Sequence, residues 1–304
     1  MSIKEHPPQL ESSKDEPVHV PVLLDEVVQL LNPRPGDRYL DLTAGYGGHA
    51  RQILAKTDNY SDSTLVDRDD FAVGHVQDLV RQGATMLETD FVSAATQLIG
   101  EGKTFDMILA DLGVSSPQLD RGERGFSFRN DGPLDMRMDR RQTLTAAMVV
   151  NQYSQQELTD IIVRYGEEPR GRAGRIAEAI IQHRPIETTS QLADIVKEVG
   201  RTPGKRHPAT RTFQALRIEV NQELRLVGEL LPLLPRLLRK GGRVAVISFH
   251  SLEDRLVKQY FKEQADAGYE AELDMLTKKP LDGSTYDVHN PRSRSAKLRA
   301  AVKK

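Results

Sequence analysis

Alternation of short apolar strands with helical segments is the feature that most narrows the folds open to this chain. Strands are predicted at 38–42, 64–66, 84–87 and 105–110, and apolar residues at helical spacing lie between them at 49–55 and 71–82. A further helix is predicted at 20–31, where the turn 32–36 ends it with two prolines. Strands that alternate with helices form a parallel sheet with crossover helices on its faces. The sequence therefore predicts an α/β fold with a doubly wound sheet.

The alternation stops near Arg121 and resumes near Gln222. Between these residues no strand run is evident, and five segments have helical spacing: 146–153, 156–165, 175–183, 190–199 and 212–220. We therefore expect a discontinuous sheet domain, residues 18–120 and 222–304, that carries an all-helical insertion at 121–221.

The last third of the chain returns to α/β patterning. Pro232 and Pro235 fall inside a helical segment and should kink or split it before a buried strand at 243–249. The stretches 272–277 and 296–300 are expected to form an edge hairpin with a long loop.

Composition excludes several classes of protein. The chain has no cysteine, which rules out disulfide frameworks, thiolate metal sites and a cysteine nucleophile. No apolar run approaches the ~18 residues of a membrane span, and the polar segment 1–17 is typical of a disordered leader. We therefore expect a soluble cytoplasmic protein without a membrane partner. With 42 basic and 44 acidic residues, any surface that binds nucleic acid has to be a local patch.

A glycine-rich turn, Gly45-Tyr46-Gly47-Gly48, follows the first strand, which ends in Asp41. Glycines at such a turn let the backbone bend sharply and approach a ligand without an intervening Cβ. The second strand ends in Asp67, a carboxylate that is placed to accept both hydroxyls of a ribose. These features indicate an adenosine cofactor, and the spacing of Asp41, Gly45 and Gly47 favours S-adenosylmethionine over a dinucleotide. The alternative is a tight strand–helix turn without a ligand.

The fourth strand ends in Asp111, and the loop that follows contains Ser115-Ser116-Pro117-Gln118. This loop resembles the Ser/Asp/Asn-Pro-Pro-aromatic loop of methyltransferases that modify exocyclic amines of bases. The N4 amine of cytosine is a poor nucleophile because its lone pair is delocalised into the ring. A hydroxyl and a backbone carbonyl can accept its two hydrogens and turn the lone pair toward a methyl group. Asp111, Ser115, Ser116 and Pro117 are therefore candidate catalytic residues, unless the segment is only a polar loop with a turn proline.

Five long blocks of sequence resemble the bacterial 16S ribosomal RNA cytosine-N4-methyltransferases, the RsmH or MraW family. They cover residues 19–50, 111–139, 207–224, 241–258 and 290–300. The resemblance implies a Rossmann-like, S-adenosylmethionine-dependent methyltransferase sheet with a helical substrate-recognition insertion. It implies direct in-line methylation of the N4 amine of a cytidine in the decoding region, without a covalent enzyme intermediate.

The resemblance also implies the cofactor contacts. They fall on Gly47, Gly48, His49, Asp67, Phe91, Asp111 and Gln118. The chain departs from the family's usual residues at Ala44 and Tyr46. This departure motivates an alternative function, that of an RNA-binding factor in ribosome assembly with a vestigial cofactor site. A nicotinamide dehydrogenase is a weaker alternative, because no acid–base residue is evident beside the loop after Asp111.

Clusters of basic residues predict contact with RNA phosphates. The candidate RNA-binding residues are Arg121, Arg124, Lys205, Arg206, Arg211, His250, Arg292 and Arg294. The alternatives are a solvated helix face and, near Arg124, a small apolar cluster that pins the insertion. Ser251 and Asp254 are predicted to cap a helix, and no metal site is expected because no second histidine lies at ligand spacing. The expected partner is 16S ribosomal RNA, within the small ribosomal subunit, and a homodimer is compatible with the sequence.

Overall fold

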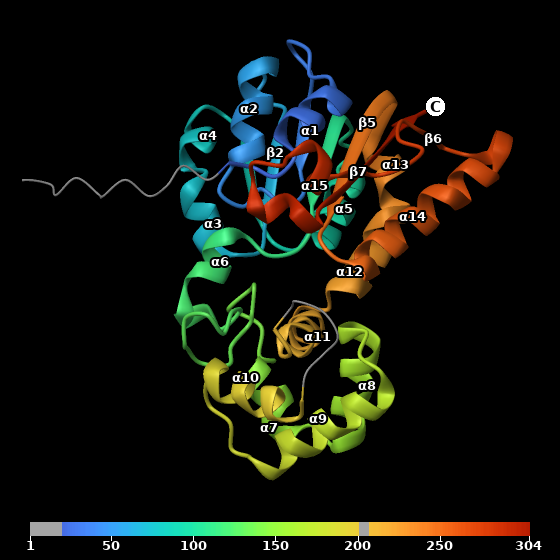
Figure 1. Ribbon diagram of the computed structural model, residues 1–304. Helices are drawn as coiled ribbons and strands as arrows, with labels where there is room; N and C mark the ends of the chain where they lie inside the picture. Colours follow the sequence, from blue (N-terminus) through green and yellow to red (C-terminus); the bar gives the residue numbers. More distant parts are fainter. Residues whose placement is uncertain (1–19, 201–206) are drawn as a thin grey trace, which may run out of the picture.

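The structure, a computed structural model, describes residues 20–200 and 207–304 and has a sheet at one end and a bundle of helices at the other (Figure 1). The sheet order is β3-β2-β1-β4-β5-β8-β6, and its first five strands are parallel. These strands are β1 (Tyr39–Asp41), β2 (Thr64–Asp67), β3 (Thr85–Glu88), β4 (Phe105–Asp111) and β5 (Leu238–Ser248). This arrangement confirms the predicted doubly wound α/β fold.

Side chains that alternate along the strands form two apolar layers, one on each face of the sheet. Tyr39, Met107 and Leu109 pack against helices α1 (Leu24–Leu31), α2 (Gly48–Thr57) and α4 (Gln77–Arg81). Leu40, Ile108 and Ala110 pack against α5 (Phe91–Gly100), α12 (Glu223–Leu230), α13 (Leu234–Leu237) and α14 (Ser251–Asp266). Both faces of the sheet are therefore covered, as a parallel sheet requires.

Helix α5 is an element that the sequence analysis does not predict. Its N-terminus is capped by Asp90, whose side chain accepts hydrogen bonds from the backbone N–H groups of Val92 and Ser93 at 2.9 and 3.0 Å. An aspartate directly before an apolar stretch is a typical helix start, so the signal was present in the sequence.

The carboxyl-terminal part follows the prediction except at the start of β5. The helix splits at the two prolines into α12, a 3₁₀ turn (Leu231–Leu233) and α13. Strand β5 begins at Leu238 rather than at 243, because an irregularity opposite Phe105, with Gly241 at φ 78°, lengthens it. The expected hairpin is confirmed: β6 (Leu273–Met275) pairs antiparallel with β8 (Lys297–Lys303). The loop between them holds β7 (Leu281–Asp282), α15 (Gly283–Tyr286) and a 3₁₀ helix, η4 (Pro291–Ser295).

The bundle has an apolar core of its own, which runs from Phe126 to Val220. It contains α7 (Ala146–Gln152), α8 (Gln155–Gly166), α9 (Arg170–Gln182), α10 (Thr189–Glu198) and α11 (Thr210–Asn221). All five predicted helices of this region are present, and the bounds 121–221 for the insertion stay a prediction. The chain enters the bundle through α6 (Ser116–Asp120) and a short 3₁₀ helix, η1 (Gly122–Arg124). The leader 1–17, Lys205 and Arg206 lie outside the described residues.

Helix α3 (Asp70–His75) completes the sheet domain beside α4. Within residues 20–200 and 207–304, every helix is too short or too polar to cross a bilayer.

Candidate active site

A cleft of about 890 Å³ lies at the carboxyl ends of the parallel strands, where the sheet domain meets the bundle. Ligands of open α/β sheets bind at this edge. The predicted residues that line it are Gly48, His49, Asp67, Phe91, Asp111, Ser115, Pro117, Gln118, His250 and Arg292. The cleft thus brings the glycine turn and the Ser115–Gln118 loop to one cavity, although the two segments are far apart in the sequence.

The glycine turn reaches the cleft in a conformation that favours glycine. Gly45 and Gly47 have φ angles of 51° and 75°, in the left-handed region, and α2 begins directly afterwards at Gly48. A Cβ on Gly47 would lie 2.7 Å from Nη1 of Arg51, and a Cβ on Gly48 would lie 2.5 Å from Cγ of Pro21. Both positions are therefore packed closely against Arg51 and Pro21, and Gly45, Tyr46 and Gly48 line the cleft at the N-terminus of α2, where the first N–H groups have no partner within the helix.

Asp67, at the end of β2, is held by two backbone hydrogen bonds. Its Oδ2 accepts from the N–H of Gly45 at 2.8 Å, and its Oδ1 accepts from the N–H of Asp69 at 2.9 Å. Burial raises the pKa of Asp67 above its usual value, although these two bonds oppose the shift. Each carboxylate oxygen keeps a second lone pair, so the group can accept two hydroxyls of a ribose.

Two more carboxyl groups lie at the neighbouring strand ends. Asp41 accepts the hydroxyl of Tyr39 at 2.8 Å, and burial raises its pKa to about 7. Asp111 lies 3.7 Å from Nδ1 of His49, and its Oδ1 accepts no hydrogen bond from the described residues. Burial, and then the charges of Asp41 and Glu253, raise the pKa of Asp111 well above its usual value. Asp41, Asp67 and Asp111 form a carboxyl cluster, of which Asp67 and Asp111 line the cleft while Asp41 is buried.

The loop after Asp111 is braced by a buried polar chain. Ser115 is the N-cap of α6, and its backbone N–H donates to Oε1 of Gln118 at 2.9 Å. Nε2 of Gln118 donates to Asp69 at 2.6 Å, and Nη1 of Arg124 donates to the same carboxylate at 2.9 Å. Ser115 and Pro117 therefore face the cleft from a fixed turn.

The structure corrects the prediction that Arg124 contacts RNA. Its side chain is only 5% exposed and is paired with Asp69, which is equally buried. The second guanidinium nitrogen, Nη2, donates to the backbone carbonyls of Arg137 and Met138 at 3.0 and 3.3 Å. A buried carboxylate needs a charged partner, and Arg124 is the partner of Asp69. Arg124 is therefore not a surface cation that could contact RNA.

The prediction that Ser251 and Asp254 cap α14 is wrong by one residue. The N-cap is His250, whose Nδ1 accepts from the N–H of Glu253 at 3.4 Å, while Oε2 of Glu253 accepts from the N–H of His250 at 3.3 Å. The hydroxyl of Ser251 instead bonds to Glu167 of the bundle, and Asp254 accepts from Nε of Arg299 at 2.7 Å. His250 therefore caps α14 in place of Ser251.

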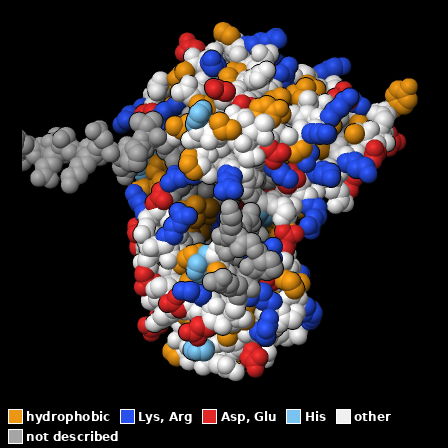
Figure 2. Space-filling model, in the orientation of Figure 1, with side chains coloured by type: hydrophobic (Ala, Val, Ile, Leu, Met, Phe, Trp, Pro, Cys, Tyr) orange, Lys and Arg blue, Asp and Glu red, His pale blue; other side chains and the backbone are white. Residues whose placement is uncertain are grey.

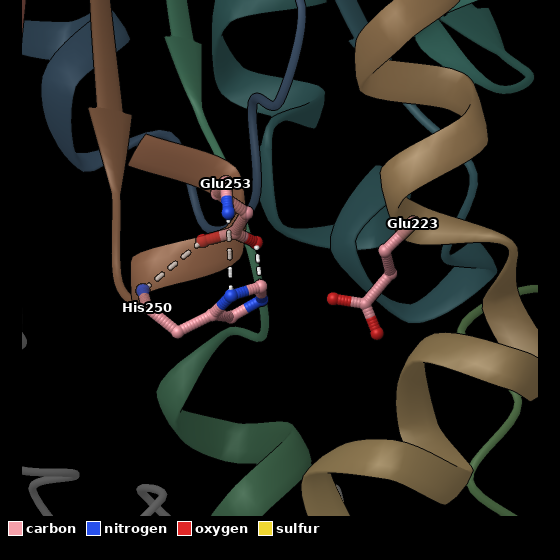
Figure 3. Close-up of side chains that lie close together, drawn as sticks. All are labelled: Glu223, His250 and Glu253. Carbon is pink, nitrogen blue, oxygen red and sulfur yellow. Dashed lines mark hydrogen bonds and ion pairs between the residues drawn. The ribbon is translucent and has the colours of Figure 1, made fainter. Parts of the chain in front are cut away.

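His250 belongs to a buried charged cluster at one wall of the cleft. Figure 3 shows the carboxylate of Glu253 above the imidazole ring and the carboxylate of Glu223 to the right of the ring. The ligand atoms of these three residues lie within 4.8 Å of one another, a spacing that could hold a metal ion. However, both oxygens of Glu223 already accept hydrogen bonds from Arg217, at 2.9 and 2.8 Å. The guanidinium thus supplies the positive charge that a metal would bring, and we assign no metal here.

The charged cluster is the part of the site that the sequence analysis missed. Burial alone would raise the pKa of Glu253, but hydrogen bonding to His250 and the charge of Arg217 lower it, so this carboxylate stays ionised. Arg217 and Glu223 lie on two successive helices, α11 and α12, and no local motif links them to Glu253. Only their common position on the cleft identifies them.

The remaining predicted RNA contacts lie around the cleft. The guanidinium of Arg121 stacks 3.6 Å from the ring centre of Phe71, and Arg292 donates to Asp120 at 2.6 Å. Arg211 donates to the backbone carbonyl of Glu167 at 3.1 Å, and Arg294 is exposed on η4. These four arginines can reach solvent, whereas the side chain of His250 is 9% exposed and reaches only the cleft wall.

Comparison with known proteins shows which family this chain resembles in sequence. The model of the MraW methylase family matches residues 16–304. The protein named ribosomal RNA small subunit methyltransferase H from Acidobacterium capsulatum is 48% identical over 298 residues, which cover 94% of this chain and 98% of that protein. The protein of the same name from Cyanothece sp. is 49% identical over 286 residues, 93% of this chain and 94% of the relative.

Solved structures resemble the chain more distantly. TrmN from Thermus thermophilus aligns with a TM-score of 0.44 and 13% identity over 93% of this chain and 48% of that one. The N-methyltransferase NodS from Bradyrhizobium japonicum aligns with a TM-score of 0.43 and 10% identity over 92% of this chain and 93% of its own.

Proposed function

Because the chain belongs to the MraW methylase family, we propose that it methylates the N4 amine of a cytidine in the decoding region of 16S ribosomal RNA. The chain is a methyltransferase, and its cofactor is S-adenosylmethionine, as the sequence predicted. One observation carries the choice of an amine as acceptor: the glycine turn with Asp67 and the Ser115–Gln118 loop line a single cleft.

The residues of the cleft fit this cofactor. The turn at Gly45 to Gly48 carries Gly45 and Gly48 to the wall of the cleft, and Asp67 presents two oriented oxygens for the ribose. S-adenosylmethionine supplies a methyl group from a positively charged sulfonium. Asp67 and Asp111 line the cleft, and Oδ1 of Asp111 has no partner among the described residues, so it can accept a hydrogen bond from the ligand.

The acceptor amine has to be held with its lone pair toward the methyl carbon. The turn at Ser115 and Pro117 is fixed through Gln118, Asp69 and Arg124, so it can present a hydroxyl and a carbonyl to the two amine hydrogens. S-adenosylmethionine, when bound, would supply the methyl group to this nitrogen, and the nitrogen would release one of its two hydrogens as a proton to water in the cleft. Alignment of two reactants in this way can lower the activation free energy by on the order of 7–11 kcal/mol.

The substrate is proposed to be RNA within the small ribosomal subunit, in the cytoplasm. Arg121, Arg211, Arg292 and Arg294 would contact its phosphates, since each lies at the surface near the cleft or the bundle. His250 and the charged cluster would face the extruded base, because they form a wall of the same cleft.

Methylation of purified small-subunit RNA and of immature subunits tests this function, with nucleoside mass spectrometry as the readout. The wild-type chain should produce N4-methylcytidine at one position. Asp67→Ala should abolish the product and weaken cofactor binding in calorimetry by tenfold or more, about 1.4 kcal/mol. Asp70→Ala is the matched control, because Asp70 is exposed on α3, and it should retain both.

Two outcomes would reject the proposal. Methylation at another atom or base would overturn the N4 assignment. RNA binding without any cofactor binding would favour the assembly factor with a vestigial site.

A further inference from the structure

Helix α14 leaves the cleft and carries a row of cations on its exposed face. Its N-cap, His250, lines the cleft, and Arg255, Lys258 and Lys262 follow along the helix. Residues three and four apart lie on the same face of a helix, so these three side chains form one row. All three are exposed, and Figure 2 shows Lys and Arg side chains gathered on the side of the molecule that α14 occupies in Figure 1.

The row continues onto the helical bundle through one shared residue. Oε1 of Glu167, the C-cap of α8, accepts from Nη2 of Arg255 at 2.9 Å, and its backbone carbonyl accepts from Nη1 of Arg211 at 3.1 Å. One arginine of the bundle and one of the sheet domain therefore meet where the two parts join. We call Arg211, Arg255, Lys258 and Lys262 the α14 track.

The position of these cations does not serve the stability of α14. The helix dipole favours basic residues in the last turn, but the last turn of α14 has none and instead carries Glu263 and Asp266. Among the described residues, Lys258 and Lys262 form no ion pair. The exposed pair of Arg255 with Glu167 contributes less than about 1 kcal/mol. Lys258 and Lys262 are therefore available to neutralise the charge of a ligand.

The chemistry of the row fits a polyanion better than a folded protein. Interfaces with proteins have an apolar or aromatic centre, and the exposed positions of α14 around Lys258 are polar or charged, such as Gln259 and Glu263. The seven steps from Arg255 to Lys262 rise about 10 Å along the helix axis. The row is therefore long enough to contact more than one phosphate of an RNA strand.

We propose that the α14 track binds the phosphate backbone of the RNA strand next to the target nucleotide and fixes the direction in which that strand leaves the cleft. The proposal rests on the proposed function, because it takes RNA as the substrate. It adds a binding surface on the sheet domain, which the basic segments predicted from the sequence do not include.

Binding of a small-subunit RNA fragment at several salt concentrations tests the track. Lys258→Gln/Lys262→Gln should raise the Kd for RNA about tenfold and lower the slope of log K against log salt by about 2, one for each phosphate contact. The matched control is Lys56→Gln/Lys197→Gln, which removes two exposed lysines from α2 and α10 and should change the Kd less than twofold. In kinetics, the track variant should raise KM for RNA and leave kcat and the Kd for S-adenosylmethionine unchanged.

A track variant with the Kd and salt slope of the wild type would overturn the proposal, and so would equal losses in both double variants. The binding readout is independent of turnover. If the wild type binds RNA but does not methylate it, the proposed function fails, while the salt slope still decides whether the track binds RNA.

Discussion

At the scale of single residues, two adjacent glycines serve the cofactor turn for different physical reasons. Gly47 supplies a backbone conformation, with φ 75°, that side chains with a Cβ rarely adopt. Gly48 has ordinary helical geometry, but Pro21 occupies the space that its Cβ would need. The segment before α1 therefore packs directly on the turn, and any side chain at Gly48 must displace it.

Gly48→Ala is expected to weaken both the fold and the cofactor site. The new Cβ would lie 2.5 Å from Pro21, so the packing has to shift, at a cost of about 1–3 kcal/mol of unfolding free energy. The Kd for S-adenosylmethionine should rise at least tenfold in calorimetry. Gly74→Ala is the control, because nothing lies within 4 Å of its Cβ position on α3, and it should stabilise the protein by about 0.5–1 kcal/mol. Unchanged cofactor affinity in Gly48→Ala would contradict this account of the turn.

At the scale of elements, one buried ion pair joins the loop of the reactive residues to the second strand. Arg124, in η1, and Gln118, in α6, both donate to Asp69, which lies between β2 and α3. Arg124 also donates to two carbonyls of the segment that leads into the bundle. The pair thus fixes the position of α6 and of Ser115 against the sheet.

Arg124→Ala should lower the free energy of unfolding and should not act through a lost contact with RNA. Loss of one partner leaves the Asp69 carboxylate buried without its counter-charge, a change that costs about 3–5 kcal/mol. Urea unfolding should show this loss, whereas Arg129→Ala, at an exposed arginine nearby, should change stability by less than about 0.5 kcal/mol. If Arg124→Ala kept wild-type stability and lost only affinity for RNA, the structural role of Arg124 would be refuted.

At the scale of the whole molecule, the fold places three carboxyl groups close together at the carboxyl ends of neighbouring strands. Asp41, Asp67 and Asp111 end three neighbouring strands, and all three have a raised pKa because they are buried together. Ionisation of these buried carboxyl groups costs stability as the pH rises, and a cation bound beside Asp67 and Asp111 would offset part of that cost. The cofactor should therefore stabilise the whole molecule more strongly above pH 7 than at pH 5.

The pH dependence of unfolding tests the cost of this cluster. The pKa of Asp41 is about 7 in the folded state and 3.8 in the unfolded chain, so its contribution to stability is full below pH 4 and is lost as the pH rises to about 7. Asp41→Asn removes this loss, and its unfolding free energy relative to the wild type should rise by on the order of 2–4 kcal/mol between pH 4 and 8. Urea unfolding at four pH values measures the difference.

Asp78→Asn provides a control of opposite sign. Hydrogen bonds from Arg51 lower the pKa of Asp78. The contribution of Asp78 to stability is therefore present at neutral pH and is lost as the pH falls below the pKa of an ordinary aspartate. Asp78→Asn should therefore be less stable than the wild type at pH 7, with a deficit that shrinks on acidification. Parallel pH curves for Asp41→Asn and the wild type would show that Asp41 does not carry the predicted charge penalty.

The α/β class, the helices between the two parts of the sheet domain, the glycine turn and the family are all predictable from the order of the residues. These features depend on local patterns: apolar periodicity, strand-end carboxylates and a contiguous loop such as Ser115–Gln118. The sequence also located Asp67 and Asp111, because a parallel sheet brings the ends of its strands to one edge.

The roles of the charged side chains, in contrast, follow from their surroundings in the folded molecule. Arg124 and Arg217 belong to the same compositional class as Arg121 and Arg211, yet burial beside Asp69 and Glu223 makes them structural partners. Likewise, the track on α14 and the cluster of His250 with Glu253 and Glu223 depend on which helices meet at the cleft. The role of a charge depends on its solvent exposure and on the partner opposite it, and both are set by residues distant in the sequence.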